Sequence, residues 1–191
     1  YPLPRVPLLI CYWNPEDGRS VKVTDPGEYL EPVPIWKHFN YDMTLASGFW
    51  DYHPFMDHKV IVEETDEWAV YENGSGAHLK YWKHRMGTPE HVAFQMTTRE
   101  IWEEKYRPLL QDFDPIRINI LGGRKAYAEA GEAKVWRYFG HLHIFEAMRS
   151  SMGDVTLYEN LLLDPDWIND YCRVYTDFFL KGFQYQFDHI G

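Results

Sequence analysis

Two histidines separated by one residue, His141 and His143, are the side chains of this sequence best suited to chemistry. They lie at the end of residues 135–141, an apolar run that predicts a buried strand. Positions i and i+2 of a strand point the same way, so both imidazoles could act on one ligand or metal ion. No third metal ligand is evident nearby, so we predict a catalytic pair and no metal site. The structural alternative has one imidazole capping the next helix and the other buried in a hydrogen bond.

Aromatic rings and a carboxylate are expected close to this histidine pair. Tyr12 and Trp13 end the first predicted strand, and Trp50, Asp51 and Tyr52 follow the second. The carboxyl ends of parallel strands meet at one edge of a sheet, where α/β proteins place their sites. An aromatic wall with one carboxylate suits an apolar or macrocyclic substrate, whereas the alternative is ordinary aromatic packing.

One charged pair follows the histidines. Glu146 and Arg149 are three residues apart on a predicted helix, which places them on the same face. We include both among the substrate-binding candidates, with a structural ion pair as the alternative. The sequence contains none of the common dinucleotide, phosphate-loop, zinc-protease or serine-hydrolase motifs, which excludes those motif-bearing classes.

Buried strands and helices must position these residues. Continuous apolar character predicts strands of a parallel sheet at residues 6–13, 42–48 and 135–141. Between the second and third of these, β-rich segments predict an antiparallel meander, inserted at about residues 58–84. The Asn73-Gly74 pair within the meander is typical of a hairpin turn.

Helix-start signals occupy the rest of the chain. Thr97 and Glu100 have capping-box spacing, and Asp-Pro pairs at 114–115 and 164–165 predict two further helix starts. The second helix is expected to reach about residue 133 and the last about residue 188. Helical spacing places an apolar face on the last helix, formed by Ile168, Tyr171, Cys172, Tyr175, Phe178, Phe179 and Gly182. A shorter helix is expected from Phe145 to about Gly153. Strands alternating with helices predict an α/β fold with a parallel sheet.

Composition and charge limit the partners. The chain has 191 residues, of which 45% are hydrophobic, and a net charge of −10. An acidic balance disfavours nucleic acid, and no apolar run reaches the roughly 18 residues of a membrane span. Cys11 and Cys172 form neither a disulfide framework nor a paired metal motif, which is typical of a reducing compartment. We predict a cytoplasmic protein without nucleic-acid or membrane partners.

Several stretches together resemble the uroporphyrinogen decarboxylase family in its broad sense. Their order and spacing span nearly the whole chain, and they are residues 5–7 (RVP), 35–42 (IWKHFNYD), 60–94, 97–110 (TTREIWEEKYRPLL) and 145–171. The resemblance implies a (β/α)₈ barrel, a fold that typically needs about 250 residues. We therefore expect residues 1–191 to be a single partial domain, the N-terminal part of such a barrel with the meander inserted. The missing initiator Met leads to the same expectation of a fragment.

The resemblance implies one of two chemistries. Family members either decarboxylate uroporphyrinogen without a cofactor or transfer methyl groups from a corrinoid, with zinc activating a thiol acceptor. Zinc and a corrinoid are expected only in a full-length protein, because the zinc ligands belong to the second half of the barrel. Uroporphyrinogen is rich in carboxylates, which favour arginine forks, yet residues 11–19 carry more acid than base where decarboxylases have an arginine-containing segment. We expect the methyltransferase-like branch, with decarboxylation in porphyrin biosynthesis as the alternative.

A third possibility is a binding module without catalysis. Trp50, Trp82 and Trp136 would then be platforms for a ligand such as a sugar. This hypothesis predicts a complete and independently stable domain. The enzyme hypothesis predicts instead a small-molecule, tetrapyrrole or corrinoid substrate, with a corrinoid protein and a homodimer as possible partners.

Overall fold

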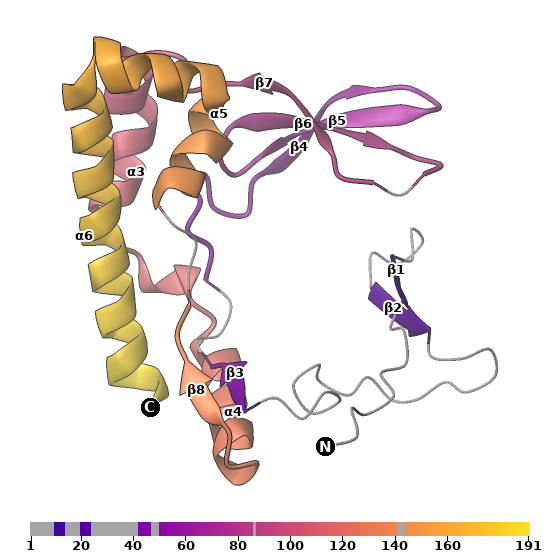
Figure 1. Ribbon diagram of the computed structural model, residues 1–191, viewed down its shortest axis with the longest axis vertical. Coiled ribbons are helices and arrows are strands. Elements are labelled where there is room, and N and C mark those ends of the chain that lie inside the picture. Colours follow the sequence, from indigo (N-terminus) through magenta and orange to yellow (C-terminus); the bar gives the residue numbers. More distant parts are fainter. Residues whose placement is uncertain (1–9, 14–19, 24–41, 47–49, 86, 141–143) are drawn as a thin grey trace, which may run out of the picture.

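The computed structural model of the protein describes residues 10–13, 20–23, 42–46, 50–85, 87–140 and 144–191. Within this part the chain is a mixed α/β structure with one parallel and two antiparallel sheets, and no closed barrel. Figure 1 shows a long C-terminal helix on one side and an antiparallel sheet that projects from the helices. The predicted α/β class is confirmed.

The antiparallel sheet is the predicted meander with one strand more. Its strands run in the order β4-β5-β6-β7. Their bounds are β4 (Lys59–Glu64), β5 (Trp68–Asn73), β6 (Ala77–Trp82) and β7 (Glu90–Phe94). The Asn73 side chain closes the β5-β6 turn by accepting hydrogen bonds from the backbone N–H groups of Ser75 and Ala77, both at 3.0 Å. The sequence pattern did not predict β7, because its residues are mostly exposed and show no clear alternation of apolar and polar side chains.

A short parallel pair lies at the other end of the helices. β3 (Met43–Leu45) pairs in parallel with β8 (Trp136–Tyr138), and α4 (Ile120–Glu132) precedes β8 in the crossover. Both predicted strands therefore exist. The expectation that β8 is buried is wrong, since all three of its residues are exposed and Trp136 is 77% accessible.

The first predicted strand is part of a different sheet. β1 (Ile10–Trp13) pairs antiparallel with β2 (Ser20–Val23), with Ile10 opposite Val23 and Trp13 opposite Ser20. Its predicted place in a parallel sheet is thus wrong. The physical reason is the short connection, because neighbouring strands along the chain turn back antiparallel while parallel strands need a long crossover.

A continuous helical segment follows the meander. It comprises α2 (Arg99–Ile101), the π-helix η1 (Trp102–Tyr106) and α3 (Arg107–Gln111). Its N-cap is Thr98, whose hydroxyl accepts a hydrogen bond from Ile101 N–H, one residue later than the predicted Thr97. The wider π turn lets both Trp102 and Tyr106 lie in the core, where each is almost fully buried.

The predicted helix after Asp114 is interrupted. Asp114 caps only a 3₁₀ turn, η2 (Pro115–Arg117), and Asn119 then caps α4 by accepting from Gly122 N–H. Between the two, Ile118 forms an isolated β-bridge with Trp50. This bridge holds residue 118 in extended conformation, so one helix cannot run through it.

Two helices complete the fold. α5 (Ile144–Leu163) contains the predicted stop at Gly153, whose φ of 75° breaks the helix before a second half continues. A Cβ at Gly153 would lie 2.6 Å from the Phe94 ring, so glycine is also required by the contact with β7. α6 (Pro165–Ile190) begins at its predicted cap, Asp164, which accepts from Trp167 N–H.

The aromatic face of α6 forms much of the core. Tyr171, Tyr175 and Phe178 are each at most 1% exposed, as the helical spacing predicted. Trp50 packs on the same face against Gly182, where any side chain would overlap the indole ring. The core therefore joins the loop after β3 to the C-terminal helix.

Candidate functional site

The structure describes only part of the predicted site. His141 and His143 lie outside the described residues, as do the side chains of Tyr12 and Trp13 in β1. Their proposed roles in catalysis and substrate binding stay predictions. The loop after β3, from Trp50 to His53, is described together with its neighbours.

Trp50 occupies the core rather than an open wall. Trp50 is 4% exposed. Its ring contacts those of Phe113, Phe178, Phe179 and Phe183 at centroid distances of 5.5 to 6.2 Å. This arrangement is the packing alternative of the sequence analysis. The same burial removes Trp50 as a platform of the hypothetical binding module.

Asp51 and His53 form a carboxylate–imidazole pair in this loop. His53 Nδ1 lies 2.8 Å from Asp51 Oδ1, which also accepts from the His53 backbone N–H at 3.0 Å. The second oxygen, Oδ2, accepts from Asp57 N–H at 2.9 Å. The Asp51 side chain is 10% exposed and that of His53 is 34% exposed. Asp51 was predicted from the sequence and His53 was not, although an aspartate and a histidine two residues apart are a visible signal.

The backbone of this loop is clamped by Arg117. The buried guanidinium donates to the carbonyl oxygens of His53 at 2.6 Å, Asp51 at 3.3 Å and Pro54 at 3.3 Å. In return, Asp51 N–H donates to the carbonyl of Arg117 at 2.8 Å. Tyr52 stacks on the His53 ring at 4.6 Å. The loop is therefore held from both its backbone and its side chains.

The electrostatics of the loop keep Asp51 ionised. Burial works to raise the pKa of Asp51, but the hydrogen bonds from Asp57 and His53, together with the His53 charge, lower it below 3.8 overall. Burial, and then the Asp51 charge, raise the pKa of the Tyr52 hydroxyl above 10.0. A buried carboxylate with these donors orients the imidazole that it contacts.

A second carboxylate–imidazole group lies on the meander. Glu72 Oε1 is 2.7 Å from His58 Nε2, and Glu72 Oε2 is 3.0 Å from His78 Nε2. Gln95 also donates to Oε2, at 2.5 Å. Burial works to raise the pKa of Glu72, but the hydrogen bonds from His78, His58 and Gln95 lower it below 4.5 overall. This group was not predicted from the sequence, although Glu72 and His78 flank the predicted turn and are directly opposite partners in the β5-β6 pair.

Glu146 and Arg149 form the predicted ion pair, extended by one residue. Arg149 donates to Glu146 Oε2 at 2.8 Å and to Asp154 Oδ1 at 2.6 Å. The hydrogen bonds that Arg149 donates to Asp154 and Glu146 raise the pKa of Arg149, and the hydrogen bond from Arg149 lowers the pKa of Asp154 below 3.8. Because Asp154 follows the Gly153 kink, the pairing links the two halves of α5. This arrangement matches the structural alternative, and substrate binding by the pair stays a prediction.

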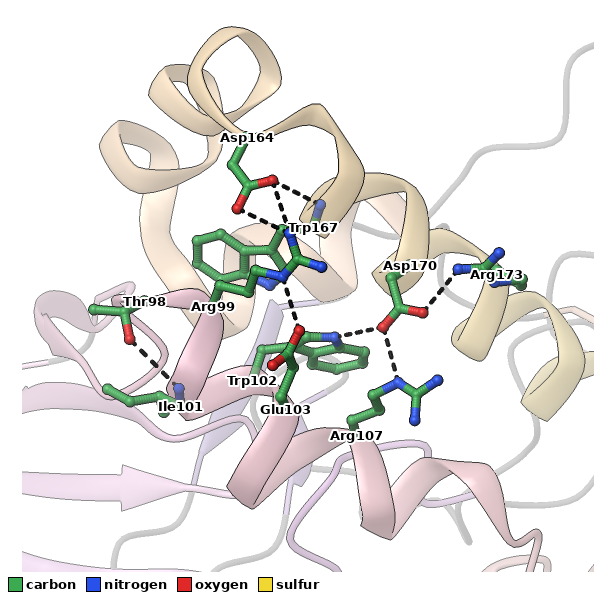
Figure 2. A network of polar contacts seen from close by, with 10 residues as sticks. All are labelled: Thr98, Arg99, Ile101, Trp102, Glu103, Arg107, Asp164, Trp167, Asp170 and Arg173. Carbon is green, nitrogen blue, oxygen red and sulfur yellow. Dashed lines mark hydrogen bonds and ion pairs between the residues drawn. The ribbon is translucent and has the colours of Figure 1, made fainter.

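A polar network joins the π-helix to α6 (Figure 2). Asp170 Oδ2 accepts from Trp102 Nε1 and Arg107 Nε, both at 2.9 Å, while Oδ1 accepts from Arg173 at 2.9 Å. Burial works to raise the pKa of Asp170, but its hydrogen bonds from Arg107, Trp102 and Arg173 lower it to about 2. Arg107, Asp170 and Arg173 border an open hollow of about 780 Å³, whose lining also includes Arg99, Glu103 and Asp166. We assign the network a structural role, because its charges are paired with each other.

Metal ligation has little support among the side chains that the structure describes. No group of three or more His, Cys, Asp or Glu among them suits a metal ion. Burial raises the pKa of the Cys172 thiol above 9.0, which disfavours the thiolate that zinc binds. The zinc that the family resemblance implies stays an expectation, because its ligands are expected in the second half of the barrel.

Comparisons with protein-family models, with curated proteins and with solved structures found no match to this chain. Across the part that the structure describes, none of the helices combines the length and the apolar character needed to cross a membrane. The functional conclusion therefore depends on the site and its topology.

Proposed function

We propose that this chain is part of a uroporphyrinogen decarboxylase-like barrel enzyme of the corrinoid-linked methyltransferase branch. One observation carries the proposal: β3 and β8 are parallel, and their crossover contains α4. The Asp51–His53 loop follows the carboxyl end of β3, which is the edge where barrel enzymes place their sites. The meander lies between the two strands in sequence, where the resemblance would insert it.

The surface of the parallel pair supports the same proposal. Met43, Leu45, Trp136 and Tyr138 are between 45% and 77% exposed. Parallel sheets are normally covered on both faces by helices, and their edges by further strands. Apolar side chains on this pair would be covered by the other strands and helices of a barrel.

Arginine geometry favours methyl transfer over decarboxylation. Binding a substrate rich in carboxylates needs guanidinium groups with free donors near the site. In the described segments every arginine is paired with a carboxylate, hydrogen-bonded to a backbone carbonyl or stacked on an aromatic ring. The arginines of these segments are Arg85, Arg99, Arg107, Arg117, Arg124, Arg137, Arg149 and Arg173. Arg117, the one beside the loop, is used on the loop backbone.

The test is a direct comparison of both activities. The protein expressed from its complete gene is given methylcob(III)alamin with a small thiol and, separately, uroporphyrinogen. We expect demethylation of the corrinoid, which is monitored through its visible absorbance, and formation of the methyl thioether. Rapid consumption of uroporphyrinogen with no methyl transfer would reject the methyltransferase branch. Inactivity on both substrates would reject the proposal as a whole.

A groove beside β8 favours a second candidate, the binding module. Tyr127, Trp136, Phe139 and Phe187 contribute to the lining of an open groove of about 450 Å³. Exposed aromatic rings beside a groove are suited to stacking on a sugar face. This candidate predicts that Trp136→Ala abolishes oligosaccharide-induced changes in tryptophan fluorescence, while Trp82→Ala, on the meander, leaves them unaffected. The absence of any such change in the unaltered chain would reject it.

A further inference from the structure

We propose that His53 is the proton acceptor of this site, acting through Nε2, and that Asp51 is the residue that positions it. The inference adds a general base that neither the sequence pattern nor the family resemblance pointed to. Its geometric basis is the difference between the two ring nitrogens, because one is bound to Asp51 and the other has no hydrogen-bond partner among the residues that the structure describes.

The hydrogen bond to Asp51 assigns the tautomer of His53. Both oxygens of an ionised carboxylate only accept hydrogen bonds, so Nδ1 must carry the hydrogen in its 2.8 Å contact with Asp51 Oδ1. In a neutral imidazole, Nε2 then holds the lone pair. The His53 side chain is 34% exposed, so a ligand can reach it. A base oriented by a buried carboxylate in this way is the arrangement that proton-transfer enzymes use.

The rest of the loop fixes the ring before any substrate arrives. Arg117 holds the carbonyls on either side of Tyr52, and Tyr52 stacks on the imidazole. The β5-β6 turn closes the remaining side, since Phe55 N–H donates to Gly74 O and a Cβ at Gly74 would lie 2.8 Å from His53 Cβ. Such a ring needs little reorganisation to accept a proton.

The histidines on Glu72 are not equivalent to His53. His58 and His78 both direct Nε2 to the Glu72 carboxylate. In its neutral form each of these imidazoles keeps a lone pair on Nδ1, but both share one carboxylate, which lies on β5 rather than in the loop after β3. Among the imidazole–carboxylate pairs of the described residues, the bond through Nδ1 singles out Asp51–His53.

The chemical step rests on the proposed function. A thiol acceptor loses its S–H proton to His53 Nε2, and the electron pair left on sulfur forms the new S–CH₃ bond. The carbon–cobalt bond of the methyl donor breaks as this bond forms. Its electron pair stays with the corrinoid, whose cobalt is thereby reduced, and no further oxidant or reductant is needed.

The first experiment reads the tautomer without any substrate. The full chain is labelled with ¹⁵N-histidine, and the His53 signals are identified by their loss in His53→Gln. At mildly alkaline pH we expect hydrogen on Nδ1 and none on Nε2. In Asp51→Asn the preference for Nδ1–H should be lost, whereas the matched variant Asp57→Asn, which keeps the donating backbone, should retain it. Hydrogen on Nε2 of His53 in the unaltered chain would overturn the proposal.

The second experiment uses methyl transfer by the protein expressed from its complete gene. His53→Gln should lower kcat about a hundredfold with little change in KM, because general-base catalysis contributes about 10²–10⁴-fold. Added imidazole should restore part of the rate in His53→Gly, which a merely structural role would not permit. His58→Gln is the control and should retain normal kcat.

The two possible failures are distinguishable. If the unaltered protein transfers no methyl group, the proposed function fails, and the ¹⁵N result still decides whether His53 has a free Nε2. If the unaltered protein is active and His53→Gln is equally active, the inference about His53 is wrong while the proposed function stands.

Discussion

Two carboxylate–imidazole groups of this protein use the same chemistry for different ends. Asp51 binds one imidazole through Nδ1, within a loop whose partners are two residues apart. Glu72 binds two imidazoles through Nε2, from His58 and His78, which are 14 and 6 residues away in sequence. The Asp51–His53 pair leaves an accessible basic nitrogen. The Glu72 group joins His58, directly before β4, to the β5-β6 hairpin. The position of each group, in the loop after β3 or on the meander, therefore separates a candidate base from a structural cross-link.

The surroundings of the two carboxylates also differ, in side-chain exposure and in the groups that hold them. The Asp51 carboxylate is 10% exposed and its loop is clamped by the buried Arg117. The Glu72 carboxylate is 20% exposed and has Gln95 as its third donor. Near it lies the buried Tyr106, whose hydroxyl has no hydrogen-bond partner and whose pKa is raised by burial and by the Glu72 charge. The carboxylate of the proposed site is thus the more buried of the two, and its loop has hydrogen bonds from a buried guanidinium.

Removal of the clamp should have the largest effect. Arg117→Met leaves buried carbonyls of the Asp51–Pro54 loop without donors, and each such group costs about 1–3 kcal/mol. We expect a loss of about 3 kcal/mol or more in the free energy of unfolding, measured by urea denaturation. Arg124→Met, which removes one exposed bond to the His189 carbonyl, is the control and should cost under about 1 kcal/mol. Equal losses in the two variants would contradict the clamp.

Asp170, whose partners include two arginines, provides a reference for the stability that a paired carboxylate contributes in this protein. Asp170→Asn should lower stability at neutral pH by about 2 kcal/mol, after allowance for solvent screening. The pKa of Asp170 is lowered from 3.8 to about 2, so its contribution is complete above 3.8 and disappears as pH falls toward 2. Unfolding curves of both proteins across this range should converge at the acidic end. Asp166→Asn, on the rim of the same hollow, is the control.

Asp51→Asn tests the first group itself. An asparagine offers one carbonyl oxygen to three donors, so at least one buried N–H group loses its partner, at about 1.5 kcal/mol. Because the pKa of Asp51 is below 3.8 in the folded chain, the destabilisation should be full above that pH and shrink as pH falls below it. Asp57→Asn should cost clearly less, and a pH-independent difference would argue against an ionised Asp51.

Glu72→Gln should give the smallest effect of the four. The amide oxygen of glutamine can still accept a hydrogen bond, but its NH₂ group would face the donors that meet the second carboxylate oxygen in the unaltered chain. We expect this change to cost about 1 kcal/mol in a partly exposed site. The His53 tautomer and the rate of methyl transfer should not change. Glu63→Gln, on exposed β4, serves as the control for stability. A change in the His53 spectrum would show that the two groups are coupled rather than separate.

Local signals predicted much of the fold. The Asp164-Pro165 cap and the apolar spacing of α6 predicted that helix to within two residues of its end. The hairpin at Asn73–Gly76 and three strands of the meander were also predicted. These features depend on neighbours within a few residues, so a sequence pattern is enough to reveal them.

Long-range contacts decided what the patterns left open. The helix after Asp114 is split because Ile118 bridges Trp50, 68 residues earlier in the chain. β1 turned out to pair antiparallel with β2, and β8 turned out to be exposed. Periodicity reports which residues are apolar, but it does not report which surfaces meet.

The candidate site shows the same division. The sequence by itself determined that Asp51 follows a strand end, that a hairpin turn lies at Asn73-Gly74, and that α6 has an apolar, largely aromatic face. Only the tertiary structure decided that Trp50 is buried on that face, that Arg117 holds the loop, and that Asp51 meets Nδ1 of His53 while Glu72 meets Nε2 of His58 and His78. The physical reason is that residue type sets which groups can accept or donate, while backbone geometry sets which of them come within hydrogen-bonding distance.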